Sequence, residues 1–480
     1  MEITLGQALA LLAAGMSAGL GGVSAIGLGI TAAHGIRVVS EKERLFGRAI
    51  VFSIVPETQM IYALLIAILI LVGIGTFGGG FRDISIGTAL AVIGAAFAVG
   101  FAASSSIGQG ITAGEGISKV SENEATFGRA IVFSVVPETQ ALYGLLAAIL
   151  ILFSVGLLGG GIRDVSVPLG FLAIGAGLSI GIAGTSAIGQ GVTAALGIRA
   201  SSEDPNMFGR ALVFSAIPET QAIFGLLITI MLLTFGGFLG GTSAEISLGQ
   251  GLAAVGAGLA VGFAGTSAIG LGITAGYGIL ATKERREMFG RSLIFSVIPE
   301  TQAIYGLLIA LILFMYSGII GGVHTASLTI GIAAIAMGFA TGIAGLSAVG
   351  QGITAGNAIN AIARRNEMFG RAILFSAIPE TQAIYGLLMS ILFGVSIGLF
   401  GTVKNIEIET VLAIVGGGLS IGLDGLSAIG QGITAAATIN VMCDREGAMG
   451  RGLLFSVLSE TFAIFGLLVV ILILIGLSLL

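Results

Sequence analysis

The chain has 480 residues, of which 55% are hydrophobic and 9% are charged, and its formal net charge at pH 7 is −5. A soluble domain carries about 25% charged residues, so this composition excludes a water-soluble globular protein, and the small net charge gives no reason to expect nucleic acid as a partner. Apolar runs of 25 to 30 residues exceed the roughly 20 that cross a bilayer as a helix, and they predict an all-α, multi-pass membrane protein.

The chain starts with Met1-Glu2-Ile3-Thr4, which has no basic residue. We therefore interpret the first apolar segment as a transmembrane helix and not as a cleavable signal peptide. Cys443 is the single cysteine, which excludes an intrachain disulfide and a cysteine metal cluster. His34 and His324 have no counterparts in the other repeats, and we assign them no chemistry and expect no cofactor.

An internal repeat of about 80 residues organises the whole chain. In the first repeat, a Gly/Ala/Ser-rich segment (5–36) precedes a charged loop (37–48), a bulkier apolar segment (49–76) and a glycine-rich turn (78–80). This pattern predicts six helical hairpins and twelve transmembrane helices. The predicted hairpins are 1–79, 82–160, 163–241, 244–322, 325–402 and 405–480.

The basic residues predict the orientation. Of 20 Lys and Arg, 17 lie in or beside the loops inside the hairpins, and only Arg82, Arg163 and Lys404 lie in the turns between hairpins. The positive-inside rule places the intra-hairpin loops in the cytoplasm and both termini outside. All six hairpins are then parallel, unlike the inverted repeats of many secondary transporters.

The first helix of each hairpin is rich in glycine, which lets helices in a membrane approach closely. We expect these helices to form a collar inside a ring of bulkier helices. Loose matches to G-x-G-x-x-G lie within apolar helix in a chain of 80 glycines, so we reject a dinucleotide site. The sequence has no P-loop pattern.

The second helix of each hairpin carries a glutamate within an apolar run, as in Pro56-Glu57-Thr58-Gln59. Glu57 lies nine residues after Arg48, which is about 13–14 Å along a helix and near the bilayer midplane. An ionised carboxylate there costs roughly 2.5–3.5 kcal/mol or more, so a proton or a bound cation must neutralise it. The six glutamates recur every 80 or 81 residues as Glu57, Glu138, Glu219, Glu300, Glu380 and Glu460.

Neutral oxygen donors accompany these glutamates. Pro56 lacks an N–H and frees a backbone carbonyl, while Thr58 and Gln59 add a hydroxyl and an amide. Such oxygens suit a hard cation, and one carboxylate matches one positive charge; alternatively, the amides only join helices. The corresponding residues of later repeats are Thr139, Gln140, Thr220, Gln221, Thr301, Gln302, Thr381, Gln382 and Thr461, and a first-helix glutamine precedes four glutamates by 29 residues at Gln109, Gln190, Gln351 and Gln431.

The glycine-rich first helix, the loop ending in Phe-Gly-Arg and the Pro-Glu-Thr-Gln stretch followed by Tyr or by Tyr-Gly resemble the proteolipid (c or K subunit) of V-type and A-type rotary ATPases, six times in one chain. The resemblance implies a membrane rotor ring whose glutamates carry Na+ or H+ past an arginine of an a/I-type stator subunit. It also implies further copies of the chain in the ring, a central-stalk subunit on the charged loops, surrounding lipid, and no catalysis by the chain alone.

The combination of glutamines on both helices resembles the Na+-binding version of this family, whose sites join two neighbouring hairpins. One hairpin would then supply a backbone carbonyl, the Thr, the Gln and a Tyr that orients the glutamate, and the next would supply the first-helix Gln and the Glu. The carried-over carbonyls belong to Val55, Val136, Ile217, Ile298, Ile378 and Leu458, and the tyrosines are Tyr62, Tyr143, Tyr305 and Tyr385.

Departures from this pattern fall in two of the six expected sites. Leu271 replaces the glutamine and Phe224 the tyrosine at the site of Glu300. At the site of Glu57, Leu28 would face a hairpin 6 in which Phe465 replaces the tyrosine and Phe462 a glutamine. Both losses recur every three hairpins, as does the stretch 2–7 at 245–250, so the chain resembles a duplicated three-hairpin unit. We hypothesise that these two sites bind Na+ more weakly or carry protons.

One carboxylate in every hairpin, rather than in every second one, gives more ions per turn of the rotor and favours a machine that synthesises ATP. The competing function is a repeat-built channel or secondary transporter, which parallel repeats with carboxylates at one depth disfavour.

Asp424, in the first helix of hairpin 6, replaces Ala or Gly of the other repeats. We expect it to be protonated and bonded to a hydroxyl such as Ser427 or to face the ring interior, rather than to transport ions. We expect the protein to reside in the cell membrane of a prokaryote.

Overall fold

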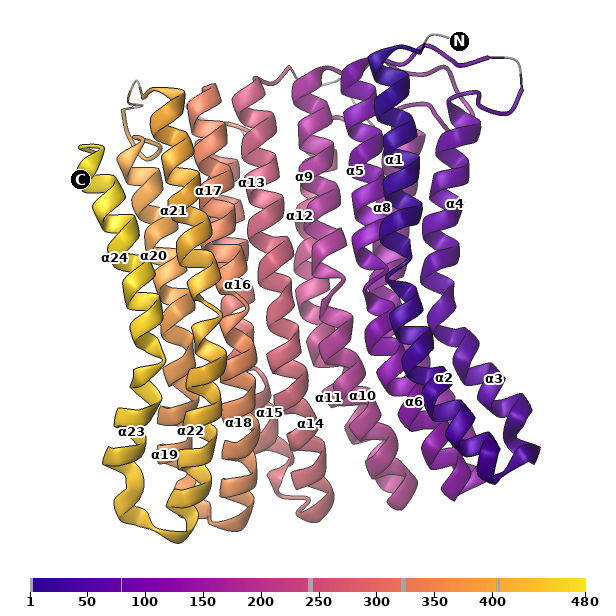
Figure 1. Cartoon of the computed structure of the whole chain (residues 1–480), viewed down its shortest axis with the longest axis vertical. Coiled ribbons are helices and arrows are strands. Elements are labelled where there is room, and N and C mark those ends of the chain that lie inside the picture. The colour runs from indigo at the N-terminus through magenta and orange to yellow at the C-terminus, as the bar shows by residue number, and fades with distance from the viewer. Residues whose placement is uncertain (1–2, 79, 241–244, 321–324, 403, 405) are drawn as a thin grey trace.

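The computed structural model describes residues 3–78, 80–240, 245–320, 325–402, 404 and 406–480. These residues form helices joined by turns and loops, with no strand among them. The helices pair into six hairpins that stand side by side in chain order, and the two termini lie at the same end (Figure 1). Within this described part of the chain, eleven helices, or twelve if one bent pair is counted as a single span, are long and apolar enough to cross a membrane. The chain is thus a multi-pass membrane protein of fused hairpins.

The first limb of each hairpin, here called the inner layer, consists of two helices that follow each other almost without a break. The pairs are α1 (Leu5–Gly21) with α2 (Ser24–Glu41), α5 (Ile86–Ala102) with α6 (Ser105–Glu122), α9 (Val167–Ala183) with α10 (Ser186–Glu203), α13 (Leu248–Ala264) with α14 (Ala268–Glu284), α17 (Leu328–Ala344) with α18 (Ser347–Arg364), and α21 (Ile408–Asp424) with α22 (Ser427–Asp444). Each limb spans about 37 residues. At 1.5 Å per residue it exceeds the roughly 30 Å bilayer core, so its end extends into the aqueous phase.

The second limb, here called the outer layer, is divided at the repeated glutamate. The pairs are α3 (Phe46–Ile54) with α4 (Thr58–Gly73), α7 (Phe127–Val135) with α8 (Thr139–Ser154), α11 (Phe208–Ala216) with α12 (Thr220–Phe235), α15 (Met288–Ser296) with α16 (Thr301–Tyr316), α19 (Phe369–Ala377) with α20 (Thr381–Ser396), and α23 (Met449–Leu458) with α24 (Glu460–Gly476).

A short 3₁₀ turn holds the Pro-Glu pair in five of these limbs, because proline cannot donate to the preceding turn of helix. In hairpin 6 Ser459 takes the place of the proline, and the described helices α23 and α24 meet at a 42° bend instead. The 3₁₀ turns at the glutamate are η2 (Val55–Glu57), η4 (Val136–Glu138), η6 (Ile217–Glu219), η8 (Ile298–Glu300) and η10 (Ile378–Glu380). The others are η1 (Glu43–Leu45), η3 (Glu124–Thr126), η5 (Pro205–Met207), η9 (Asn366–Met368) and η11 (Glu446–Ala448) at the loops, and η7 (Gly265–Ser267) between α13 and α14.

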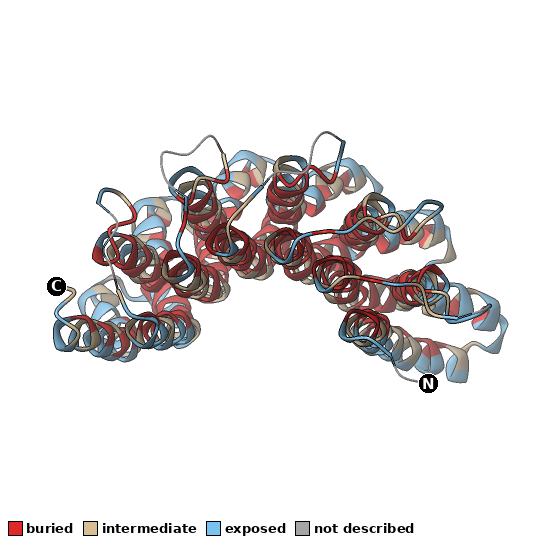
Figure 2. Ribbon diagram, turned by 90° about the horizontal axis from the view of Figure 1, so that it is seen from above, coloured by how far each residue is buried: buried red, intermediate tan, exposed pale blue. Residues whose placement is uncertain are grey.

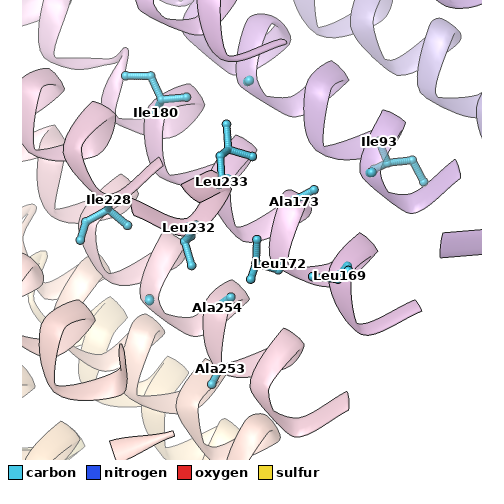
Figure 3. Packing of buried hydrophobic residues seen from close by; sticks show 14 of the residues in the cluster. Ile93, Leu169, Leu172, Ala173, Ile180, Ile228, Leu232, Leu233, Ala253 and Ala254 are labelled. Carbon is cyan, nitrogen blue, oxygen red and sulfur yellow. The ribbon is translucent and has the colours of Figure 1, made fainter. Parts of the chain in front are cut away.

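The inner layer packs backbone against backbone. A Cβ added to Gly189 of α10 would lie 1.9 Å from the carbonyl oxygen of Ala268 in α14, and one added to Gly272 would lie 2.0 Å from that of Gly189. No side chain fits at these positions, as expected for small-residue contacts in membranes. Larger residues fill the space between the layers, where Leu232 of α12 lies near Ala254 of α13 in the same cluster (Figure 3).

The sequence stretch that recurs 243 residues apart forms a helix cap. The Thr4 N–H donates to Gln7 Oε1 at 2.8 Å, and the Gln7 N–H donates to Thr4 Oγ1 at 3.3 Å. Ser247 and Gln250 make the same capping box at the start of α13. This reciprocal pair satisfies two of the N–H groups that a helix start leaves free.

Seen from above, the hairpins form an open arc with the inner layer on its concave side and the two chain ends far apart (Figure 2). The most apolar stretch of the first inner limb has 33% of its residues buried, against 78% for that of the second. The two ends of the arc therefore expose surfaces that every internal hairpin covers with its neighbour.

Candidate functional site

The site between hairpins 1 and 2 joins residues from both. Tyr62 of α4 donates its hydroxyl to Glu138 Oε1 at 2.6 Å, and Gln109 of α6 donates its amide to Glu138 Oε2 at 3.2 Å. Gln59, fully buried, donates to Gln109 Oε1 at 2.6 Å. A Tyr from the preceding hairpin and a Gln from the same hairpin therefore hold the two carboxylate oxygens.

Neutral oxygens lie next to Gln59, which is linked to this carboxylate through Gln109. The Thr58 hydroxyl lies 3.2 Å from the Val55 carbonyl oxygen, to which it donates, and 3.3 Å from Gln59 Oε1. The 3₁₀ turn η2 brings these groups together because Pro56 interrupts the α-helical hydrogen-bond ladder there. Among the described residues, no group of three or more His, Cys, Asp or Glu side chains is placed to hold a metal ion.

The same arrangement occurs at three further junctions, with hydrogen bonds of 2.6–2.9 Å from tyrosine and between glutamines, and of 3.1–3.2 Å from glutamine to carboxylate. Each set also has its threonine hydroxyl on the preceding carbonyl oxygen. The sets are Val136, Thr139, Gln140, Tyr143, Gln190 and Glu219; Ile298, Thr301, Gln302, Tyr305, Gln351 and Glu380; and Ile378, Thr381, Gln382, Tyr385, Gln431 and Glu460. We call these four junctions the complete sites.

The junction between hairpins 3 and 4 differs. Leu271, fully buried, replaces the glutamine, and Phe224 replaces the tyrosine. Glu300 has the Thr220 hydroxyl as a polar neighbour, while Gln221 Nε2 is buried and has no hydrogen-bond partner among the described residues. We call this junction the reduced site.

The sixth set of residues is divided between the two ends of the arc. Glu57 is exposed, whereas the other five repeated glutamates are half-buried. At the other end, the Thr461 hydroxyl donates to the Leu458 carbonyl at 2.7 Å, and Phe462 and Phe465 are 62% and 60% exposed. Within one chain these residues do not meet.

Asp424 corrects an expectation. Ser427 Oγ has no partner among the described residues, and the hydroxyl that interacts with the Asp424 carboxylate is that of Ser420, one helical turn earlier. The carboxylate packs over Gly466 of α24, where an added Cβ would meet its Oδ2 at 1.6 Å, so it faces the outer layer and not the concave interior. Only Gly466, which lacks a side chain, leaves room for it.

We assign no functional site to the two histidines, which do not recur across the repeats. His34 makes a hydrogen bond of 2.9 Å with Ser118 of the next hairpin, which is a structural role, and His324 lies outside the described residues. A hydrogen bond that sequence reasoning missed links the inner layer: Thr31 donates to the Gly110 carbonyl, and the equivalent threonines of hairpins 2 to 5 donate likewise to the hairpin that follows. The sequence shows the threonine recurring with the repeat. It does not show the acceptor, because a backbone carbonyl is present in every residue.

The sequence of the chain is similar to that of known proteins. Six segments match the family of the ATP synthase C subunit, at residues 12–70, 93–151, 174–232, 255–313, 335–393 and 415–473.

Three relatives are matched over most of their own length. The A-type ATP synthase subunit K of Methanocaldococcus jannaschii is 50% identical over 226 residues, which make up 47% of this chain and 96% of the relative. The V-type sodium ATPase subunit K of Enterococcus hirae is 34% identical over 29% of this chain and 91% of the relative. The 16 kDa proteolipid of the human V-type proton ATPase is 30% identical over 30% of this chain and 90% of the relative. One match in each of six hairpins shows that the chain belongs to the family of the ATP synthase C subunit, as a rotor proteolipid of the V/A-type ATPases with six hairpins fused in one chain.

Proposed function

We propose that this proteolipid carries Na+ on its mid-membrane glutamates. The observation that supports the proposal is the complete site, in which Tyr62 and Gln109 hold the carboxylate. Gln109 is hydrogen-bonded to Gln59, whose amide oxygen accepts from Thr58, and the Thr58 hydroxyl also reaches the Val55 carbonyl oxygen. Oxygen donors suit hard cations, and a single carboxylate balances a single positive charge. A bound Na+ also removes the cost of an ionised group in the bilayer.

H+ is the alternative ion for the same rotor role. A proton needs the carboxylate and does not need five oxygens from two hairpins, so the ligand count favours Na+. The relatives include both a sodium and a proton ATPase proteolipid by name. A channel or secondary transporter is a weaker alternative, because the sites lie at separate hairpin junctions and do not converge on a common path.

We further propose that copies of the chain close into a ring. Thr434 of hairpin 6 donates to Gly430 within its own helix, whereas each equivalent threonine also donates to the next hairpin. Gly29 of hairpin 1 occupies the position equivalent to Gly110, and beyond its own stretch of helix no described atom lies within 4 Å of a Cβ added there. A second copy placed after hairpin 6 would provide this acceptor and would bring Thr461 towards the second copy's Glu57.

The remaining roles follow from the rotor function. The chain performs no bond chemistry itself. We place the charged loops in the cytoplasm of a prokaryotic cell, against a central-stalk subunit, and the glutamates against an arginine of the stator. Each ion contributes about 2.3 kcal/mol per 100 mV, so a carboxylate in every hairpin raises the energy delivered per turn and favours ATP synthesis.

Labelling with a carbodiimide, which reacts with carboxyl groups that no cation occupies, tests the ion. We expect Na+ at near-neutral pH to protect Glu138, Glu219, Glu380 and Glu460 in the purified complex, as quantified by peptide mass spectrometry. K+ at the same ionic strength is the control. Labelling that Na+ does not change would favour H+, and the absence of labelling at all six glutamates would favour a structural role.

The native mass of the detergent-solubilised rotor tests ring closure. We expect an integral multiple, two or more, of the 48.0 kDa chain mass. A rotor containing a single copy would contradict the proposal unless the arc closed on itself.

A further inference from the structure

We propose that the reduced site at Glu300 is a low-affinity Na+ site, so that the rotor moves fewer Na+ per turn than it has glutamates. This inference rests on the proposed Na+ function and specifies it site by site. It is carried by the contacts of Glu300, Gln221 and Leu271, which differ from those of the complete sites on either side in the same chain.

The carboxylate of Glu300 lacks the two donors that hold the others. At Glu219, the Tyr143 hydroxyl donates at 2.7 Å and the Gln190 amide at 3.2 Å, one to each carboxylate oxygen. At Glu300 the corresponding side chains are Phe224 and Leu271, which have no polar group to donate. An anion that receives no such hydrogen bonds is less stable inside the membrane. The ionised form of Glu300, which Na+ binding requires, is therefore less favourable than that of Glu219.

The neutral ligands are also affected. In a complete site, Gln140 Nε2 donates to Gln190 Oε1 at 2.7 Å, which fixes the direction of the Gln140 amide and leaves its Oε1 beside Thr139. At the reduced site Gln221 is fully buried, its Oε1 accepts from Thr220, and its Nε2 has no hydrogen-bond partner among the described residues. Leu271 thus removes one amide oxygen from the site and leaves the Nε2 of Gln221 without an acceptor among the described residues.

The reduced site has a counterpart where two copies would meet. Leu28 and Phe465 reproduce both replacements there, and Phe462 removes the glutamine as well. Each half of the chain, three hairpins long, therefore contributes two complete sites and one reduced one. If reduced sites remain without Na+, the Na+ to ATP ratio of the machine is two thirds of the value that the number of glutamates gives.

Residue-resolved protection of the intact complex is the direct test. At increasing Na+ concentration, we expect half-protection of Glu300 from carbodiimide to require at least about tenfold more Na+ than that of Glu219, since the loss of one hydrogen bond to a charged group already has that effect. Equal protection of the two glutamates would overturn the inference and leave the Na+ function standing. No protection at any glutamate would overturn both.

Exchanging the differing residues between the two sites gives reciprocal variants. The double substitution Phe224→Tyr with Leu271→Gln rebuilds a complete site and is expected to lower the half-protecting concentration at Glu300 by at least about tenfold. Tyr143→Phe with Gln190→Leu should raise it at Glu219 by a similar factor while Glu380 in the same chain stays unchanged as the internal control. If neither exchange moves the protection of its glutamate, these residues do not set Na+ affinity and the inference fails.

Discussion

The inner and outer layers of the same hairpins differ in how closely neighbouring helices pack. In the inner layer, neighbouring helices touch through their backbones, and a Cβ at Gly189 would lie 1.9 Å from a carbonyl oxygen. In the outer layer, no described atom beyond its own stretch of helix lies within 4 Å of a Cβ added to Gly209, and the glutamates of complete sites are half-buried. Close packing in the inner layer fixes the geometry of the arc, and looser packing in the outer layer leaves the carboxylates partly exposed.

The largest expected effect comes from breaking the close packing. Gly189→Ala forces α10 and α14 apart, and we expect a loss of about 1–3 kcal/mol in stability, as for overpacked cores. The measurement is thermal or detergent-induced unfolding of the purified protein. Gly209→Ala is the matched control, and it should be neutral or stabilising by up to about 1 kcal/mol because alanine favours helix. Similar losses in both variants would mean that the layers do not differ.

The next effect concerns the chemistry of the outer layer. Tyr305→Phe removes the hydroxyl that donates to Glu380 at 2.6 Å, and it should weaken Na+ protection of that glutamate about tenfold with little loss of stability, since a hydrogen bond to a charged group is worth roughly 1.5–3 kcal/mol. The sites of Glu138 and Glu219 in the same protein serve as controls. Unchanged protection of Glu380 would show that the tyrosine does not hold the carboxylate for the ion.

The smallest effect probes the hydrogen bond that links the inner helices. Thr193 donates to the Gly272 carbonyl at 3.0 Å, and Thr193→Val keeps its shape while removing the donor. We expect a loss of about 1 kcal/mol in stability, measured by the same unfolding assay, with no change in Na+ protection. Thr434→Val, whose hydroxyl reaches no second hairpin in one chain, should cost less in the isolated chain and a comparable amount in a closed ring.

Sequence reasoning came close to the final picture at the glutamates because repetition makes the signal unambiguous. The period predicted the hairpins, and the position of Glu57 predicted a mid-membrane carboxylate. The resemblance to the Na+-binding proteolipids implied that consecutive hairpins share a site, and under that pairing the losses at Phe224 and Leu271 fall in one site. The structure places Tyr62 and Gln109 on Glu138 in keeping with that pairing.

Other features were out of reach. The sequence suggested Ser427 as the partner of Asp424, but which hydroxyl is near depends on helix rotation, and the structure selects Ser420. The Thr31 bond to a glycine carbonyl and the glutamine pairs between Gln59 and Gln109 depend on how neighbouring helices are aligned along their axes.

The sequence by itself determined that this is a membrane chain of six parallel hairpins with a carboxylate at one depth in each, because hydropathy and period are local properties of the chain. Only the tertiary structure decided how these side chains hydrogen-bond to one another at each carboxylate and which of them remain open at the ends of the arc. The contacts of Gln59 with Gln109 and of Tyr62 with Glu138 join residues 50 and 76 positions apart, and they exist only once the glycine-rich inner layer brings neighbouring hairpins within hydrogen-bonding distance.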